Sequence, residues 1–463
     1  MYYLAIDIGS TTVKAALIDA AAGVAKAYRS IPLPQASVNT DYIYEVSADK
    51  IYLLIEQLLK DYGSLVDDKR LFLRFSTQMH GFILANQAAD ALTPYISWRD
   101  NRSLQRINGS RQSFYEFIRD FIQPDMSESG SSLKPNLAMC NLYAWLQQEM
   151  QYRSDLVFCT LGSWLGFKLT GKHASHITNA AATGLVNARW QEWNRELICD
   201  LGFQRLGFPD LLDDYDIVGE FDKDGKTFMV LPDTGDQQTA VLGTWARADT
   251  ELIINVATAG QLASISKRYE AGAYECRPYF RGSYLKTVTG LPAGRNLDVL
   301  VRFFQNTCLT LAGYRLTKEE LYSILETAGR NPKGLDVELS FFQNTLECRG
   351  GKITGILQNN LSVETIFNSA YQNMAVTYQK HMADLGSMKT WNTVVMTGGV
   401  IKRNQRLAEI MEQTIGIPRR LITTIDTVME GHYRLALVAL GIYKRLEDME
   451  KDDGIRGVRI EGE

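Results

Sequence analysis

Short apolar runs and amphipathic stretches alternate along this chain of 463 residues. Apolar runs bounded by turn residues predict strands at 2–6, 13–18, 71–75 and 393–396. Apolar residues at helical spacing predict helices at 49–62, 114–122, 142–150, 163–169, 296–311, 318–327, 363–382 and 404–415. Strands that alternate with helices are typical of an α/β fold. The polar tail after Lys451 is expected to fray.

The turn between the first two predicted strands is unusually polar. It follows Asp7 and contains Gly9, Ser10, Thr11 and Thr12, although a hairpin turn needs only a residue that tolerates positive φ. Three adjacent hydroxyls suit a turn whose backbone N–H and side-chain O–H groups all point at one anion. Lys14 follows shortly after, where it either supports the anion or is a solvated surface charge.

A weak internal repeat links this stretch to the middle of the chain. The segment LIINVATAGQLASIS, residues 252–266, again places a small-residue turn between two apolar runs, with Thr258, Ala259 and Gly260 at the turn. A duplicated phosphate-binding hairpin predicts two related domains that face each other across one nucleotide. Two hairpins with small turns also arise by chance in a chain of this length, so the repeat alone leaves both interpretations open.

A third element contains two adjacent glycines. The predicted strand at 393–396 leads to Gly398 and Gly399 and then to a helix, near whose start Asn404 lies. Glycines there let a flat base or a ribose approach the backbone, and Asn404 could hydrogen-bond it. An ordinary strand-to-helix turn is the alternative. Together, the two hairpins and this turn resemble the phosphate-1, phosphate-2 and adenosine elements of the actin-like ATPases, which implies ATP as a ligand.

Composition narrows the class of protein. Hydrophobic residues make up 45% and charged residues 22% of the chain, as in ordinary globular proteins, and the length predicts more than one domain. The net charge of -4 argues against nucleic acid as a partner. The six cysteines include no Cys-x-x-Cys pair, which indicates free thiols in a reducing compartment. An N-terminus that enters a strand at once and the lack of a membrane-length apolar run predict a cytoplasmic protein without a membrane partner.

The chemistry is expected in LPDTGDQQTAVLG, residues 231–243, where Gly235 and Asp236 lead into a helix. An isolated acid at a helix start is often only a cap. The whole stretch, however, resembles the catalytic segment of the FGGY carbohydrate kinases, and the resemblance extends over nearly the whole chain. It also rests on STQMHG at 76–81, SWRDNR at 97–102 and the segments 176–194 and 350–375.

The resemblance implies an α/β fold with two actin-like (ribonuclease H-like) ATPase domains and a cleft between them. Domain 1–245 would carry the sugar site, the phosphate-1 hairpin and the catalytic Asp236, and domain 246–463 the phosphate-2 hairpin and the adenosine site. The implied reaction is ATP-dependent phosphorylation of a primary hydroxyl of a ketose. Segments 136–146 and 341–351 favour sedoheptulose, and xylulose or another ketose or polyol is the alternative.

Some features limit or compete with this interpretation. Asn141, His176 and the run Glu430-Gly431-His432 depart from the family pattern. An actin-like or chaperone-like ATPase that acts through protein partners is a rival from another class, but it would have no reason to carry the two sugar-type segments. The sequence leaves open whether the protein is a monomer or a homodimer.

The resemblance also implies roles for single residues. Asp236 would accept the proton of the sugar hydroxyl and, with Asp7, hold Mg²⁺, an ion that keeps several waters and takes few direct carboxylates. The implied phosphate contacts are Gly9, Ser10, Thr11, Thr12, Lys14, Thr258, Ala259 and Gly260, and the implied adenosine contacts are Gly398, Gly399 and Asn404. The sugar would contact Gln78, Met79, His80, Asp100 and Asp236. Asp100 and Arg102 could instead form a surface ion pair.

Overall fold

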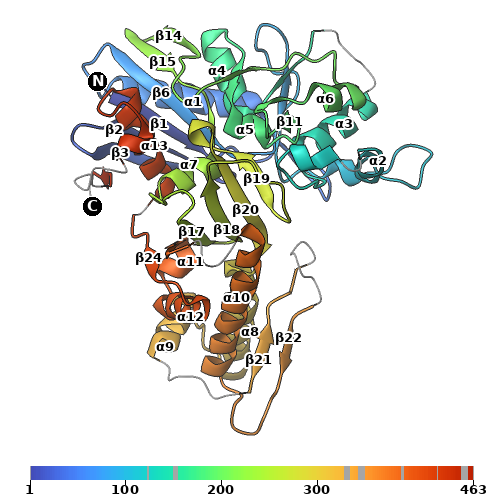
Figure 1. Cartoon of the computed structure of the whole chain (residues 1–463), viewed down its shortest axis with the longest axis vertical. Helices are drawn as coiled ribbons and strands as arrows, with labels where there is room; N and C mark the ends of the chain where they lie inside the picture. The colour runs from blue at the N-terminus through green and yellow to red at the C-terminus, as the bar shows by residue number, and fades with distance from the viewer. Residues whose placement is uncertain are drawn as a thin grey trace.

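In the computed structural model the chain forms two large β-sheets with helices packed around them (Figure 1). The structure describes residues 2–122, 125–149, 155–327, 334–342, 350–386, 391–424, 426–449 and 457–461. Among these residues, no helix combines the length and the apolar character needed to cross a bilayer. The described cysteines are free thiols, and Cys348 lies outside the described residues, as does most of the 341–351 segment.

The first sheet has eight strands and contains the opening hairpin. Its strands lie in the order β14 (Gly219–Lys223), β15 (Lys226–Val230), β6 (Arg70–Thr77), β1 (Tyr2–Ile8), β2 (Thr12–Asp19), β3 (Val24–Pro32) and β25 (Arg459–Ile460), and β16 (Thr234–Gly235) also pairs with β6. Strand β1 pairs antiparallel with β2 and parallel with β6. Because β25 pairs with β3, the expectation that the polar tail frays is wrong for these two residues.

The second sheet has six strands and repeats the topology of the first. Its order is β19 (Glu275–Pro278), β20 (Tyr284–Leu291), β18 (Gly260–Ser266), β17 (Glu251–Val256), β23 (Thr393–Thr397) and β24 (Arg419–Leu421). Strand β17 pairs antiparallel with β18 and parallel with β23, as β1 does with β2 and β6. The internal repeat predicted from the sequence is therefore confirmed.

Helices and short strands fill the connections between these strands. The longer helices are α1 (Ala48–Gly63), α2 (Phe114–Phe121), α3 (Ala138–Glu149), α4 (Leu161–Thr170), α8 (Gly294–Ala312), α9 (Lys318–Thr327), α10 (Val363–Leu385), α12 (Gln405–Ile415) and α13 (Thr427–Ala439). The shorter ones are α5 (Ile177–Ala181), α6 (Arg195–Asp200), α7 (Asp236–Leu242), α11 (Gly399–Lys402), α14 (Leu446–Met449) and the 3₁₀ turns Arg102–Leu104, Asp125–Glu128 and Phe280–Gly282. The helices expected from apolar spacing are all present, α9 with the expected bounds and the others with shifted ends, whereas α13 was not expected.

Short strands form small sheets beside the large ones. They are β4 (Val38–Asn39), β5 (Tyr44–Val46), β7 (Ile83–Ala85), β8 (Tyr95–Ile96), β9 (Val157–Cys159), β10 (Ala174–His176), β11 (Val186–Asn187), β12 (Glu192–Trp193), β13 (Asp210–Leu212), β21 (Asp336–Glu338) and β22 (Lys352–Thr354). In the sheet β4–β5–β8, strand β8 ends directly before the second sugar-type segment at 97–102, so this sheet holds the start of that segment.

Alternation along β1 gives the first sheet two different buried faces. The even positions, Leu4, Ile6 and Ile8, belong to the core that also contains the buried stripe of α1. The odd positions, from Tyr3 through Ala5, belong to a second core that includes residues of α13. A strand buried on both sides is expected to be apolar throughout. Asp7 at an odd position breaks this rule, which marks it for a role other than packing.

Helix α13 connects the two halves. It packs against α7 and lies beside β1 and β2 (Figure 1). A Cβ on Gly431 would lie 2.0 Å from the carbonyl oxygen of Thr239, and one on Gly243 would lie 1.8 Å from that of Thr427. Only glycine fits at these two crossings. Part of the C-terminal half therefore packs on the first sheet, and the division at 245/246 stays a prediction.

Candidate active site

Asp7 lies at the end of β1 and is 5% exposed. Ser76, its partner across β6, donates a hydrogen bond from Oγ to Asp7 Oδ1 at 2.7 Å. Burial, and after it the negative charge of Asp236, raise the pKa of Asp7 to about 7, against the opposing effects of Lys14 and Ser76. Two carboxylates from separate segments therefore influence each other here, an arrangement that a divalent cation stabilises.

Asp236 is the first residue of α7. Its Oδ1 accepts a hydrogen bond from the backbone N–H of Gln237 at 2.7 Å. Burial raises the pKa of Asp236 to about 6, although that hydrogen bond and the positive charges of Arg277 and Lys14 oppose the change. Such a carboxylate accepts a proton near neutral pH more readily than an ordinary aspartate with a pKa of about 4. The side chain thus has the acid–base property expected of a catalytic base.

The first sugar-type segment packs closely against Gly235. A Cβ at this position would lie 2.6 Å from Met79 Sδ and 2.5 Å from Gln238 Oε1. Strand β16 also places Gly235 beside Thr77 of β6. Met79 and Gly235, the residue before Asp236, are far apart in the sequence and are therefore held next to each other.

Asp233 anchors the loop that leads to Asp236. It is 3% exposed and accepts hydrogen bonds from Thr160 Oγ1 at 3.0 Å, Ser175 Oγ at 2.9 Å and Asn179 Nδ2 at 2.5 Å. His176, which departs from the family pattern, caps α5 and donates from Nε2 to Asp214 Oδ1 at 2.8 Å. His176 thus has a structural position, where its imidazole links the loop before α5 to the segment around Asp214.

The turn at Gly9 has the shape predicted for a phosphate-binding hairpin. The N–H of Gly9 donates to the carbonyl of Thr12 at 3.0 Å, which closes the turn, and Leu33 N–H donates to the carbonyl of Thr11 at 2.9 Å. The Thr11 side chain is exposed, and Ser10 and Thr12 are partly exposed. The hydroxyls are therefore accessible at the open end of the hairpin, although their contact with phosphate stays a prediction.

Lys14 is an ion-paired residue and not a freely solvated charge. It lies opposite Asp7 in the hairpin register, and its Nζ is 2.8 Å from Asp426 Oδ2. Burial lowers the pKa of Lys14, but the carboxylates of Asp426 and Asp7 outweigh this effect and raise it. Asp426 also caps α13, so this ion pair joins the first hairpin to the helix that crosses both halves.

A cavity of about 450 Å³ lies beside Lys14 and is lined from both halves of the chain. Its lining includes Lys14, Gln237, Gln261, Gly398, Gly399 and Asp426. Gly398 has a φ of 102°, and a Cβ there would lie 2.3 Å from the carbonyl oxygen of Val256. Both glycines of the predicted adenosine turn therefore border the cavity, and the geometry of Gly398 excludes other residues.

The second hairpin ends near the same cavity, but its turn residues lie mostly at the surface. Thr258 and Ala259 are exposed, and Gly260 is buried, with space for a Cβ blocked by the hydroxyl of Tyr378 at 2.1 Å. Their contact with phosphate stays a prediction. Asn404 is different: its Oδ1 caps α12 by accepting from Leu407 N–H at 3.0 Å, and its Nδ2 donates to Tyr371 at 2.6 Å. These two contacts give Asn404 a structural position at the start of α12, and its contact with nucleotide stays a prediction.

His80 presents an unprotonated ring nitrogen. Its Nδ1 donates to the carbonyl of Ala182 at 2.6 Å, since a carbonyl can only accept. Burial, together with the charge of Arg277, lowers the pKa of His80 to about 3, so the ring is neutral at ordinary pH. In the neutral ring, Nε2 then keeps a lone pair and accepts hydrogen bonds. A sugar hydroxyl is a suitable donor to it.

Gln78 connects the sugar-type segments to the first hairpin. Its Nε2 donates to the carbonyl of Gly9 at 3.1 Å, and its Oε1 accepts from Ser97 Oγ at 3.4 Å. The side chain is 4% exposed. In this structure Gln78 therefore aligns the hairpin with the segment around Ser97, and its predicted sugar contact remains untested.

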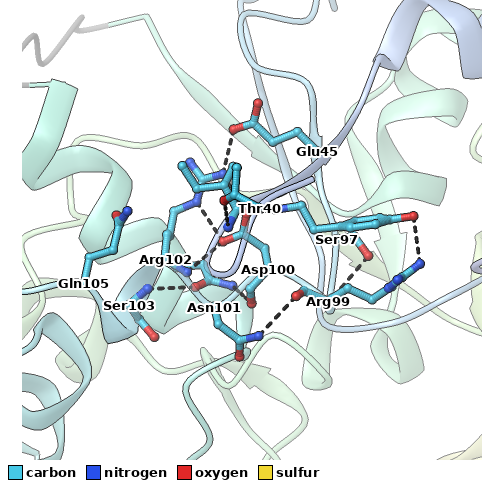
Figure 2. Close-up of polar contacts among 12 residues, drawn as sticks. Thr40, Glu45, Ser97, Arg99, Asp100, Asn101, Arg102, Ser103 and Gln105 are labelled. Atoms are coloured by element: carbon cyan, nitrogen blue, oxygen red, sulfur yellow. Dashed lines mark hydrogen bonds and ion pairs between the residues drawn. The ribbon is translucent and has the colours of Figure 1, made fainter. Parts of the chain in front are cut away.

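Asp100 is fully buried, and its carboxylate is already saturated with protein donors (Figure 2). Oδ1 accepts from the backbone N–H of Arg102 at 3.0 Å and from its Nε at 2.8 Å. Oδ2 accepts from the backbone N–H of Tyr44 and from Arg102 Nη2, both at 2.8 Å. A carboxylate offers about four acceptor positions, so none is left for a sugar. The structure contradicts direct sugar contact by Asp100, and it also places the ion pair with Arg102 in the interior and not on the surface.

We expect Asp100→Ala to destabilise the protein by about 3–5 kcal/mol, because it leaves the buried Arg102 guanidinium without its main partner. Arg102 would keep only Glu45, at 2.6 Å. Urea unfolding measures the effect. Asp120→Ala is the matched control, since Asp120 pairs with Arg119 in an exposed position and should cost less than about 1 kcal/mol. Wild-type stability with a selective loss of sugar affinity would restore the direct-contact role.

Three charged residues beside the site were missed from the sequence. Arg277, 2% exposed, donates from Nη1 to Gln237 Oε1 at 3.0 Å and forms an ion pair with Glu275. Lys134 lies 2.8 Å from Glu275. Burial raises the pKa of Glu275, but Arg277 and Lys134 outweigh it and lower that pKa to about 2. The signal in the sequence was the pair of charges in an otherwise apolar strand, Glu275–Pro278.

The same hairpin in two facing sheets and a cavity lined from both halves define an actin-like ATPase fold with two related units. The sequence profile of the FGGY family of carbohydrate kinases, N-terminal domain, matches residues 2–243. Because that match covers more than half of the chain, the chain belongs to the FGGY family of carbohydrate kinases.

Individual relatives agree with this assignment. The chain is 26% identical over 178 residues to a glycerol kinase of Thermococcus onnurineus, covering 36% of this chain and 34% of that protein. It is 23% identical over 320 residues to a xylulose kinase of Bacillus subtilis, covering 65% of this chain and 62% of that protein. The chain thus spans about a third to three-fifths of the length of these curated relatives.

The fold matches solved structures over its whole length. A xyloylose kinase from Brucella ovis superposes with a TM-score of 0.82 at 18% identity, covering 100% of this chain and 95% of that one. At this level of identity the match shows a shared fold.

Proposed function

We propose that this protein transfers the γ-phosphoryl group of ATP to a primary hydroxyl of a ketose. The observation that carries the proposal is the position of Asp236. Its partly buried carboxylate has a pKa of about 6, follows Gly235, against which Met79 of the sugar-type segment packs, and influences Asp7 at the end of β1. A base placed between a sugar segment and a phosphate hairpin is what phosphoryl transfer to an alcohol requires.

In this reaction Asp236 accepts the proton of the sugar hydroxyl as the new O–P bond forms. The bond between the γ-phosphorus and the bridging oxygen of ADP breaks, and ADP leaves. Phosphoryl transfer has a loose transition state, so the protein acts mainly by positioning groups and neutralising charge. Lys14 contributes a fixed positive charge beside the hairpin, and Gly9, Ser10, Thr11, Thr12 and Thr258 would orient the phosphates.

The residues present fit Mg²⁺. Carboxylate oxygens are ligands that this ion prefers, and Asp7 and Asp236 supply two of them. Within the described part of the chain, no hydrogen-bond donor reaches Asp7 Oδ2, so this oxygen is free for the ion or for one of its waters. When bound, the ion would neutralise charge on the phosphates of ATP.

The adenosine end of ATP would occupy the 450 Å³ cavity, where Gly398 and Gly399 expose backbone. The cavity has the size of an ordinary small-ligand site. Asn404 would approach the nucleotide only with the groups that its capping contacts leave available. Sugar and nucleotide would then meet at Asp236, each held mainly by a different part of the chain.

Sedoheptulose is the sugar we propose first, and xylulose second. The segments that favoured sedoheptulose include 341–351, most of which lies outside the described residues. The structural support for either ketose is the neutral acceptor of His80, together with the charged groups of Arg277, Glu275 and Lys134, which influence its pKa. These groups suit a substrate with a row of hydroxyls.

A coupled assay of ADP release tests the proposal, with sedoheptulose, xylulose, ribulose, glycerol and a blank without sugar. Release should depend on sugar, and a ketose should be the best substrate. Much faster release with glycerol would remove the ketose assignment and keep the kinase assignment. Equal release in the blank would favour an ATPase that acts through protein partners.

We expect His80→Ala to raise the apparent Michaelis constant for the sugar by about tenfold or more, with that for ATP nearly unchanged. The variant removes the Nε2 acceptor, and an unpaired buried polar group costs roughly 1–3 kcal/mol. Steady-state kinetics at fixed ATP measure the effect. His381→Ala is the control, because His381 is paired with Asp384 on α10, away from these segments. An unchanged sugar constant in His80→Ala would remove His80 from the sugar site.

A further inference from the structure

His432 belongs to the run that departs from the family pattern, and it lies within a buried chain of hydrogen bonds. The chain also includes Tyr3, Ser76 and Asp7. Tyr3, Ser76 and His432 are 0% exposed, and Asp7 is 5% exposed. Tyr3 and Asp7 share the face of β1 that α13 covers, and Ser76 lies opposite Asp7 on β6.

The direction of every bond in this chain follows from the chemistry of its last member. The carboxylate of Asp7 can only accept, so the single proton of Ser76 Oγ goes to Asp7 Oδ1, at 2.7 Å. The bond between His432 Nε2 and Ser76 Oγ, at 3.0 Å, must then be donated by the imidazole. The histidine is therefore protonated on Nε2.

The other ring nitrogen of His432, Nδ1, accepts a hydrogen bond. Burial, with the nearby charge of Arg74, lowers the pKa of His432 to about 3, so the ring is neutral and Nδ1 is an acceptor. Tyr3 donates to it from its hydroxyl at 3.2 Å, and burial raises the pKa of Tyr3, which keeps that hydroxyl protonated. Tyr3 therefore donates to His432, His432 donates to Ser76, and Ser76 donates to Asp7.

We propose that His432 is a positioning residue that acts through Ser76 to orient the carboxylate of Asp7 for a divalent cation. The inference rests on the proposed function, in which Asp7 holds Mg²⁺. With the imidazole donating to Ser76 Oγ, the serine hydroxyl has only one direction left for its proton. Asp7 Oδ1 is held by that proton, and Oδ2 is turned free for the ion. Bonds that orient a metal ligand from behind typically change metal affinity by about 10–100-fold.

The residues beside His432 on α13 are themselves held in place. Gly431 lets α13 approach α7, and Glu430 accepts from Trp245 Nε1 at 2.7 Å and from Val458 N–H at 2.9 Å. The residues on both sides of the imidazole are thus held by packing and hydrogen bonds. A run of small residues at these positions would offer neither the donor nor its support.

Binding of Mn²⁺ in the presence of ADP, followed by the electron paramagnetic resonance of the free ion, tests the proposal without turnover. We expect Ser76→Ala and His432→Leu each to weaken Mn²⁺ binding by about tenfold or more. His432→Gln should bind within about threefold of wild type, because the glutamine amide places an N–H near the position of Nε2. Asp7→Asn is the positive control, and Ser369→Ala, a buried serine that donates to the carbonyl of Leu335, is the matched negative control.

Different outcomes would contradict the proposed function and the positioning role. If wild type binds no Mn²⁺ with ADP, the proposed function fails. If wild type binds it and folded Ser76→Ala binds equally well, the positioning role is overturned. If Ser76→Ala binds Mn²⁺ more weakly but folded His432→Leu and His432→Gln both bind it as well as wild type does, the proposed contribution of His432 is overturned. Should His432→Leu fail to fold, Ser76→Ala and the rescue by His432→Gln carry the test, and a weakened His432→Gln would then count against the proposal.

Discussion

Replacing Asp236 with asparagine should lower sugar-dependent turnover at least about 100-fold, the usual scale for loss of a general base. Asparagine keeps the shape of the side chain but cannot accept the proton of the sugar hydroxyl. Because Asp236 is proposed to act on the sugar, the affinity for nucleotide should change little. Initial rates of ADP release at saturating sugar, with ADP binding measured separately, give both quantities.

The pH dependence of the same variant sharpens this test. Asp236 must be ionised to accept a proton, and its pKa is raised to about 6 by burial. The wild-type rate should therefore fall as the pH drops through about 6, and the residual rate of Asp236→Asn should keep only the part of this acid limb that comes from protonation of Asp7. Asp49→Asn is the matched control, since Asp49 also lies in the first turn of a helix but is exposed. Near-wild-type turnover in Asp236→Asn would remove this residue from the mechanism.

The sequence predicted the parts of this protein that depend on local pattern. The two hairpins have a strand–turn–strand pattern within a few residues, and the structure reproduces both, with β17, β18 and β23 arranged as β1, β2 and β6. The position of Asp236 at a helix start was also visible, because a loop glycine followed by an acid and small residues favours such a start. These features need no knowledge of distant contacts.

Other residues took on a meaning in the structure that their loop sequences did not show. Asp100 looked available to a sugar, but Tyr44 donates to it from a different strand and Arg102 from the next turn. Asn404 was predicted from the sequence as a nucleotide contact, and the fold adds that it donates to Tyr371 of α10. Polarity in a loop shows that a side chain needs partners, and only the fold shows whether protein or ligand supplies them.

The same reason explains what was missed. Arg277 and Glu275 lie in the second half of the chain. Arg277 contacts Gln237, which follows Asp236, and Glu275 contacts Lys134 of the first half. His432 had been noted only as a departure from a family pattern. Its meaning appears when α13 packs on β1, because Tyr3 and Ser76 then lie on either side of the imidazole.

Lys14→Met should raise the apparent constant for ATP, or lower the turnover number, by about tenfold to hundredfold. Two effects act in the same direction. The variant removes the positive charge proposed to support the phosphates, and a hydrogen bond to a charged group contributes about 1.5–3 kcal/mol. It also leaves Asp426, which lines the 450 Å³ cavity, without its cation and therefore repelling the phosphates. Steady-state kinetics with varied ATP at saturating sugar measure the change.

The acid limb of the rate should also move in this variant, and its direction is fixed by the sign of the charge. Lys14 lowers the pKa of both Asp7 and Asp236, so its removal raises both values above about 7 and about 6. Activity should then be lost at a higher pH than in wild type. Lys26→Met is the matched control: Lys26 is similarly exposed, pairs with Asp19 at 2.9 Å, and lies on β3, the neighbour of β2 in the same sheet. If both variants keep the wild-type constant for ATP and the wild-type acid limb, the charge of Lys14 has no part in binding phosphate, and the ion pair with Asp426 serves only to hold α13 against the first sheet.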